Sequence, residues 1–158
     1  MTKWDTRFIR IAREVSTWSS CLRRHVGAVI VRDKRIITTG YNGAPANCKT
    51  CYERRKCLKD ELKLEHGTGQ DKCYATHAEQ NALIQAAKLG QSIDGCTLYC
   101  THAPCATCAK LIINAGITHV VYEYAYPDEF GLSLLKESGV ENEKYENTSE
   151  SSRMNVGT

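Results

Sequence analysis

The sequence lacks the features that would point to a membrane, a secretion route or a nucleic acid. No apolar run approaches the length of about 20 residues that a membrane-spanning helix needs. Residues 1–10 carry charges and contain no apolar core of the secretion-signal type, so we expect a cytoplasmic protein. The net charge is only +3, without a basic run or interleaved aromatic residues. A polynucleotide partner is therefore not expected, whereas an anionic small molecule suits this charge.

Length and composition are those of one globular domain. The chain has 158 residues, of which 42% are hydrophobic and 25% are charged. Such a chain can bury a single core of strands and helices, and nothing in it suggests a second domain. We place the domain at residues 1–146 and expect the polar residues 147–158 to form a disordered tail.

The nine cysteines favour metal binding over disulfides. Their number is odd, and no secretion signal precedes them. In a reducing compartment, cysteines spaced as C-x-x-C bind metals more often than they form structural disulfides. We therefore interpret them as zinc ligands together with unrelated buried thiols.

Two motifs together have the composition of a catalytic zinc site. His77 and Glu79 form an H-x-E motif, and Pro104 precedes a C-x-x-C motif at Cys105 and Cys108. Cysteines three apart lie on one face of the first turn of a helix, where both sulfurs can reach one ion. One histidine and two cysteines leave a coordination position for water, and the nearby carboxylate can take a proton from it. This is the pattern of zinc-dependent nucleobase deaminases, with a purely structural metal site as the alternative.

Hydrophobic periodicity predicts an alternation of strands and helices after an initial hairpin. The predicted helices cover residues 4–20, 77–89, 105–115 and 132–138. The predicted strands cover residues 26–31, 35–40, 97–101, 117–124 and 140–145. This order predicts an α/β protein with three α/β/α layers, a mixed central sheet of about five strands and helices on both faces. The zinc motifs should then lie at the sheet edge where open α/β sheets bind ligands.

Residues 46–76 form a cysteine-rich insert. They contain few aliphatic residues and many charges, so they cannot bury enough apolar surface to become ordered alone. A structural zinc with four ligands would hold such a segment, and free surface thiols are the alternative. The candidate ligands are Cys21, Cys48, Cys51, Cys57, His66 and Cys73. We favour Cys21 and Cys73 with two of Cys48, Cys51 and Cys57.

Four segments carry a resemblance that extends beyond the zinc motifs. They are residues 20–28 (SCLRRHVGA), 40–45 (GYNGAP), 77–83 (HAEQNAL) and 104–117 (PCATCAKLIINAGI). With them, the chain resembles the deoxycytidylate (dCMP) deaminases of the cytidine deaminase-like superfamily from about residue 4 to about residue 140. The resemblance implies hydrolysis of dCMP to dUMP and ammonia, which supplies dUMP for thymidylate synthesis. It implies Zn²⁺ on His77, Cys105 and Cys108, with Glu79 as the catalytic proton carrier.

The resemblance also implies nucleotide contacts, regulation and assembly. The implied substrate-binding residues are Asn42, Ala78, Thr101, Arg24 and Tyr122, and Arg23 is a second candidate for the 5′-phosphate. The implied effector-binding residues are Gly40, Tyr41, Asn42 and Gly43. Several members of the family are hexamers that dCTP activates and dTTP inhibits, so we expect a homo-oligomer, Mg²⁺ with any bound effector, and a second, structural zinc.

Two other functions fit parts of the sequence. The zinc motifs alone also suit a deaminase of another cytosine nucleotide or nucleoside, of guanine, or of adenosine in transfer RNA. A zinc-stabilised binding or competence-related module is the alternative from another class. Glu79 argues against that module, because a protein without catalysis has no need of a carboxylate at the proton-transfer position.

Overall fold

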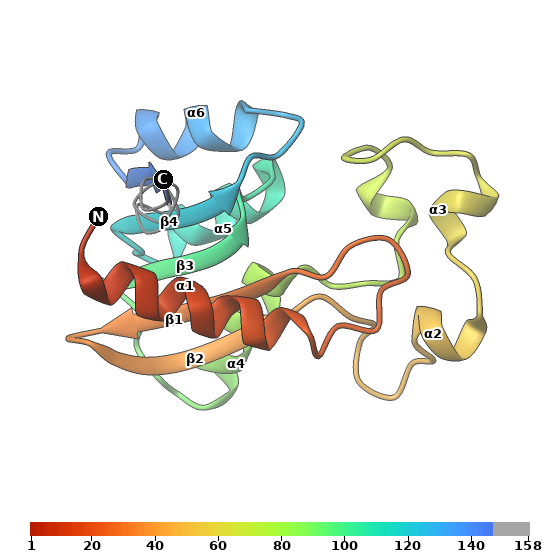
Figure 1. The fold of residues 1–158 in the computed structure, drawn as a ribbon, viewed down its shortest axis with the longest axis horizontal. Coiled ribbons are helices and arrows are strands. Elements are labelled where there is room, and N and C mark those ends of the chain that lie inside the picture. Colours follow the sequence, from red (N-terminus) through yellow and green to blue (C-terminus); the bar gives the residue numbers. More distant parts are fainter. Residues whose placement is uncertain (147–158) are drawn as a thin grey trace, which may run out of the picture.

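The computed structural model describes residues 1–146, which fold into three layers around a five-stranded sheet (Figure 1). The predicted tail, residues 147–158, lies outside the described residues. The strands are β1 (Gly27–Arg32), β2 (Arg35–Tyr41), β3 (Thr97–His102), β4 (His119–Tyr124) and β5 (Glu141–Lys144). The helices are α1 (Lys3–Ser16), α2 (Cys51–Arg54), α3 (Leu58–Glu61), the 3-10 helix η1 (Gln70–Lys72), α4 (Ala78–Lys88), α5 (Ala106–Asn114) and α6 (Phe130–Glu137).

The sheet is mixed, as the sequence predicts. Its strand order is β2-β1-β3-β4-β5. β1 pairs antiparallel with β2 and with β3, while β3, β4 and β5 run parallel. The β1–β2 hairpin turns at Asp33 and Lys34, whose φ values of 49° and 60° suit a tight two-residue turn.

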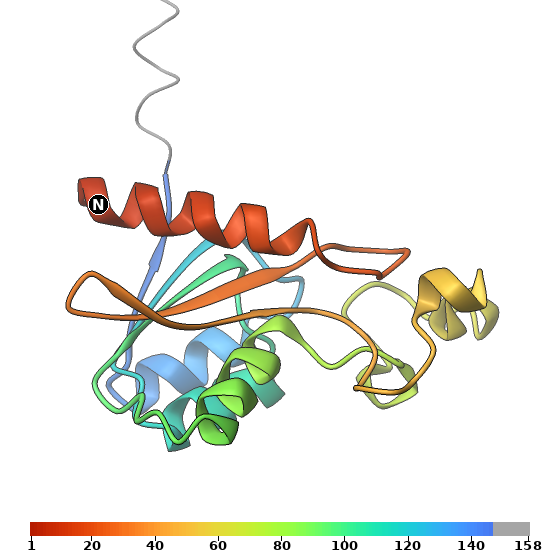
Figure 2. The same cartoon turned by 90° about the horizontal axis from the view of Figure 1, so that it is seen from below.

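Helices cover both faces of the sheet, which confirms the predicted layers. α1 lies along one face, and α4, α5 and α6 lie on the other (Figure 2). β1 shows why both faces need cover: Ala28 and Ile30 pack toward α4 and α5, whereas Val29 and Val31 pack toward α1. Successive side chains of a strand point to opposite faces, so an apolar run such as this one belongs in the middle of the sandwich. Within residues 1–146, no helix has both the length and the apolar character that a membrane crossing requires.

α1 ends four residues earlier than the prediction of a helix over residues 4–20. It ends at Ser16, because the hydroxyls of Ser16 and Thr17 donate to carbonyl oxygens one turn back at 2.6 and 2.7 Å. Phe8 and Val15 are buried as expected. Trp18, which would continue the apolar stripe, is 55% exposed and packs edge-on against Tyr41.

Gly40 positions the zinc motif of α4 on the sheet. A Cβ atom at Gly40 would lie 2.1 Å from the carbonyl oxygen of Ala78 and 2.4 Å from the nitrogen of Ala82. Only glycine therefore allows the first turn of α4 to lie directly on β2. Beyond β2, the backbone of Gly43 pairs with that of Thr76, immediately before His77.

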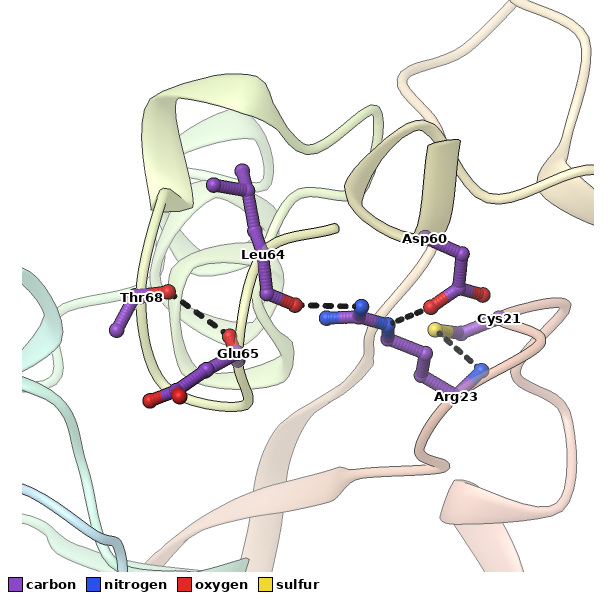
Figure 3. A network of polar contacts seen from close by, with 6 residues as sticks. All are labelled: Cys21, Arg23, Asp60, Leu64, Glu65 and Thr68. Atoms are coloured by element: carbon purple, nitrogen blue, oxygen red, sulfur yellow. Dashed lines mark hydrogen bonds and ion pairs between the residues drawn. The ribbon is translucent and has the colours of Figure 1, made fainter. Parts of the chain in front are cut away.

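The insert projects from one end of the sheet, and Arg23 holds it to the segment that follows α1 (Figures 1 and 3). The Arg23 Nε donates to Oδ1 of Asp60 at 2.5 Å, and its Nη2 donates to the carbonyl oxygen of Leu64 at 2.7 Å. The Arg23 side chain is only 15% exposed. Two of its nitrogens hold the insert in this way, whereas its Nη1 is buried without a hydrogen-bond partner among residues 1–146, so Arg23 and Arg24 both stay candidates for the 5′-phosphate.

Candidate active site

The ligand residues of both zinc motifs lie at helix starts. His77 is the N-cap of α4, and its backbone N–H donates to the side-chain oxygen of Gln80 at 2.9 Å. Cys105 is the N-cap of α5, which begins at Ala106, one residue later than predicted, and Cys108 lies in the first turn. The positive end of a helix favours a thiolate, so this placement suits both cysteines as metal ligands.

The three side chains converge with the spacing of a metal site. The Nδ1 of His77 lies 3.5 Å from Sγ of Cys105 and 3.4 Å from Sγ of Cys108. All three ligand atoms lie within 4.8 Å of one another. Tetrahedral zinc, with Zn–S of about 2.3 Å and Zn–N of about 2.0–2.1 Å, places nitrogen and sulfur roughly 3.6 Å apart. The donor set and its spacing therefore fit zinc.

A hydrogen bond between the two thiols shifts their pKa values in opposite directions. A hydrogen bond from Cys108 lowers the pKa of Cys105 to about 4, against the effect of burial and with help from His77. The same hydrogen bond and burial raise the pKa of Cys108. The hydrogen bond with Cys105 also raises the pKa of His77, while the positive charge of Lys59 opposes that shift. A divalent cation would displace the remaining protons, since the ligands of zinc are thiolate and neutral imidazole.

Glu79, two residues after the zinc-ligand candidate His77, is buried. Its side chain belongs to the first turn of α4, and the residue is only 4% exposed. Burial raises the pKa of Glu79 to about 7, although the positive charge of His77 acts in the opposite direction. A carboxyl group with a pKa near neutrality can both accept and release a proton under cellular conditions.

A cavity opens in front of the zinc motifs, between the start of α4, the segment after α1, the insert and the loop after β4. Four of the residues predicted to bind substrate line it: Arg23, Arg24, Asn42 and Ala78. Asn42 also holds the wall together. Its Oδ1 accepts from the N–H of Val26 at 2.8 Å, and its Nδ2 donates to the carbonyl oxygen of Arg24 at 2.8 Å.

The other two residues predicted to bind substrate, Thr101 and Tyr122, are buried away from this cavity. Thr101 is 3% exposed, and its hydroxyl accepts from the N–H of Gly27 at 3.1 Å. Tyr122 is 9% exposed and packs within the core that α4 and α5 cover. Among residues 1–146, neither lines this cavity, and the tyrosine that does is Tyr126.

Sequence reasoning overlooked three polar residues of the wall: Lys59, Gln70 and Tyr126. None belongs to a motif, and two come from the insert, where no periodicity signals burial. Lys59 is only 6% exposed although its neighbours are charged and polar. His102, beside Arg24, is neutral at physiological pH because burial and then the Arg24 charge lower its pKa to about 4.

The four residues predicted to bind an effector have structural contacts. Gly40 lies under α4, and the carbonyl oxygen of Tyr41 accepts from Nδ2 of Asn81 at 2.7 Å. The hydroxyl of Ser19 donates to the carbonyl oxygen of Asn42 at 2.8 Å. The backbone of Gly43 forms an isolated β-bridge with Thr76, the residue before His77. These contacts give each residue of the GYNG segment a role in the fold. Its role in effector binding stays a prediction.

Four cysteines approach one another at the base of the insert. Burial raises the pKa of Cys51, and the negative charges of Cys21, Cys57 and Cys73 raise it further. All four line the cavity, whereas Cys48 is exposed. Backbone N–H groups lie 3.4 Å from the sulfurs of Cys21 and Cys73. The four thiols lie farther apart than the ligand atoms of His77, Cys105 and Cys108. Within residues 1–146, those three residues form the one group of possible metal ligands whose atoms all lie within 4.8 Å of one another.

The three-layer fold, the His–Cys–Cys set and the buried glutamate together define the class of zinc-dependent nucleobase deaminases. Comparison with known proteins identifies the family. The family described as "Cytidine and deoxycytidylate deaminase zinc-binding region" matches residues 2–124. The chain therefore belongs to the cytidine and deoxycytidylate deaminase family.

Individual relatives support the same family. The deoxycytidylate deaminase of Saccharomyces cerevisiae is 38% identical over 87% of the chain, which spans only 43% of the yeast protein. The deoxycytidylate deaminase of Mycobacterium phage D29 is 42% identical over 75% of the chain and 93% of the phage protein. The structure of the cyanophage S-TIM5 dCMP deaminase in complex with dCMP and dUMP is 34% identical. It matches with a TM-score of 0.76 over 92% of the chain and 99% of its own.

Proposed function

We propose that the chain catalyses the hydrolysis of dCMP to dUMP and ammonia. One observation carries the proposal: Glu79 is buried beside the converging side chains of His77, Cys105 and Cys108, and all but Cys108 line one cavity. The 34% identity to a deaminase whose structure holds dCMP and dUMP supports this substrate. The domain that carries the activity would comprise residues 1–146.

The residues of the site supply the proton transfers. Zinc on His77, Cys105 and Cys108 would contribute Lewis-acid activation of water near neutral pH. A water oxygen adds to C4 of the cytosine, and the bond from C4 to the amino nitrogen breaks. Glu79 takes a proton from the water and passes it to N3 of the ring, then takes the proton of the new C4 hydroxyl and delivers it to the departing amine. Its buried position beside the zinc ligands suits a group that must do both.

The charge of the cavity favours a nucleotide over a nucleoside. Arg24 and the buried Lys59 line it, and both carry positive charge. A phosphate would be attracted to these two side chains, whereas an uncharged nucleoside would gain nothing from them. Deamination of another cytosine nucleotide or nucleoside is the competing outcome of the substrate assay below.

The first prediction tests the proposed reaction through Glu79. We expect the purified chain to release ammonia from dCMP faster than from CMP, dCTP or deoxycytidine. Glu79→Gln keeps the shape of the side chain but cannot carry the proton, so turnover should fall by at least about 10²–10⁴-fold while zinc stays bound. Glu14→Gln, an exposed change in α1, is the control. Full activity of Glu79→Gln would contradict the mechanism, and activity on none of these substrates would contradict the function.

We further infer a second, structural zinc on Cys21, Cys51, Cys57 and Cys73. The effect of Cys21, Cys57 and Cys73 on the pKa of Cys51, and the position of all four on the cavity wall, support this set over one that contains the exposed Cys48. The backbone N–H groups directed at Cys21 and Cys73 would stabilise negative sulfurs. Such a site would order an insert that has little apolar surface of its own.

The proposal extends to the regulation of the enzyme, its oligomeric assembly and its cellular location. We infer activation by dCTP and inhibition by dTTP, with Mg²⁺ bound to the effector phosphates, and assembly into a homohexamer. The exposed aromatic pair Trp18 and Tyr41, next to the GYNG residues, supports an interface at that position. Initial rates over a range of dCMP concentrations, with and without each triphosphate, test the regulation. A substrate drawn from the nucleotide pool would place the enzyme in the cytoplasm.

A further inference from the structure

Gln70 connects His77 to the insert and to the loop that follows β4. Its Oε1 lies 3.1 Å from Nε2 of His77. Its Nε2 lies 3.3 Å from the carbonyl oxygen of Gly67 and also donates to the hydroxyl of Tyr126. That hydroxyl donates in turn to the Gly67 carbonyl at 3.4 Å. Gln70 therefore has a partner at each end of its amide group.

These contacts determine where the proton of His77 lies. A carbonyl oxygen can only accept a hydrogen bond, so the end of Gln70 that faces Gly67 is the NH₂ group. The end that faces His77 is then the amide oxygen, which also only accepts, so Nε2 of His77 carries the hydrogen. A neutral imidazole has one N–H, which leaves a lone pair on Nδ1. Nδ1 is the atom that lies 3.5 and 3.4 Å from Cys105 and Cys108.

We propose that Gln70 is the positioning residue of His77, which keeps Nδ1 available to zinc and makes tight zinc binding depend on an ordered insert. The proposal rests on the metal centre of the proposed function. Metal-binding histidines usually donate their second ring N–H to an acceptor, and loss of that acceptor costs about 10–100-fold in metal affinity or activity. In this chain the acceptor comes from residues 46–76, outside both zinc motifs.

Two substitutions distinguish the effect of the hydrogen-bond acceptor of Gln70 from the effect of the size of its side chain. Gln70→Met keeps the length but removes both polar ends, whereas Gln70→Glu keeps an acceptor for His77. Zinc affinity of the full chain is measured by competition with a chromogenic chelator. We expect Gln70→Met to weaken binding by about 10–100-fold and Gln70→Glu to stay close to the parent. Nitrogen NMR of the zinc-loaded chains should show the proton of His77 on Nε2 in the parent and in Gln70→Glu.

Two further variants serve as controls. Gln85→Met changes an exposed residue of α4 and should leave zinc affinity unchanged. Tyr126→Phe removes one partner of Gln70 without touching His77 and should cause a smaller loss than Gln70→Met.

Two results would overturn the proposal: parental zinc affinity in Gln70→Met, or an equal loss in Gln70→Met and Gln70→Glu. A chain whose zinc affinity depends on Gln70 as expected, but which does not deaminate dCMP, would contradict the proposed function alone.

Discussion

Single buried residues set the chemistry of this cavity. Glu79 and Lys59 are 4% and 6% exposed, although charged side chains seldom lose their water without a partner. Glu79 has its partners in the zinc set. Lys59 takes part in none of the ion pairs within residues 1–146. Its positive charge acts to lower the pKa of His77. A lysine at a cavity wall that pairs with no carboxylate among the described residues is suited to an anionic ligand.

The second prediction follows from Lys59. Lys59→Met should raise the KM for dCMP by roughly 10- to 100-fold, because a hydrogen bond to a charged group contributes about 1.5–3 kcal/mol. The low activity on deoxycytidine, which has no phosphate, should change little. Steady-state kinetics with both substrates measure the difference, and Lys63→Met, an exposed change nearby, is the control. An equal loss with both substrates would show that Lys59 supports the fold and does not select the phosphate.

At the scale of elements, the sequence predicted what depends on local pattern. The helices and strands of the sheet, and the convergence of the zinc motifs, follow from periodicity and from the C-x-x-C spacing. The end of α1 was wrong by four residues, because two hydroxyls end the helix where apolar spacing continues. Gln70 and Lys59 could not be predicted, since their roles depend on contacts between the insert and a distant helix start.

The third prediction concerns the attachment of α1 to β3. The Tyr99 hydroxyl donates to Oδ1 of Asp5 at 2.8 Å, and the N–H of Thr2 donates to Oδ2 at 2.5 Å. Burial acts to raise the pKa of Asp5, but these hydrogen bonds outweigh it and the net shift is downward. Burial, followed by the contact with Asp5, raises the pKa of Tyr99. The pair therefore stabilises the fold above the unfolded pKa of Asp5, about 3.9, and below that of Tyr99, about 10.

Tyr99→Phe should therefore lower the free energy of unfolding by about 1–3 kcal/mol at pH 7. This difference should shrink as the pH falls through the lowered pKa of Asp5, and also as it rises above about 10. Urea unfolding of both chains at several pH values measures it. Tyr124→Phe, at a tyrosine that is 53% exposed, should change stability by less than about 0.5 kcal/mol. A difference that is independent of pH would contradict the account.

The fourth prediction concerns the insert. Elemental analysis of the parent chain should find two zinc ions, and Cys51→Ser should reduce the content to one. The loss is expected because a closed structural site needs four ligands and Cys51 lies among the other three cysteines. Cys48→Ser, at an exposed cysteine, should keep both ions. A single zinc in the parent would refute the second site.

At the scale of the whole molecule, the active site depends on parts of the chain that are far apart in sequence. The sheet places the two zinc motifs together, and the insert supplies the acceptor for His77 and a cation for the cavity. At the other side of the sheet, β2 is an edge strand that pairs only with β1 among residues 1–146. An edge that is both open and apolar is a natural site for contact with another chain.

The fifth prediction locates the assembly interface at this edge. Trp18, Ile36, Tyr41 and Ile84 are 55%, 43%, 40% and 57% exposed and belong to β2, to the segment after α1 and to α4, which packs on β2. Water-exposed apolar side chains on neighbouring elements gain free energy when a second copy covers them. Light scattering after gel filtration should therefore give a multiple of the 17.7 kDa chain, six in a hexamer. Ile84→Asp should lower that mass, because assembly would bury its charge, whereas Phe130→Asp, on α6 near the opposite edge strand β5, should not. A monomeric parent would exclude the interface, and a mass that falls equally in both variants would place it elsewhere.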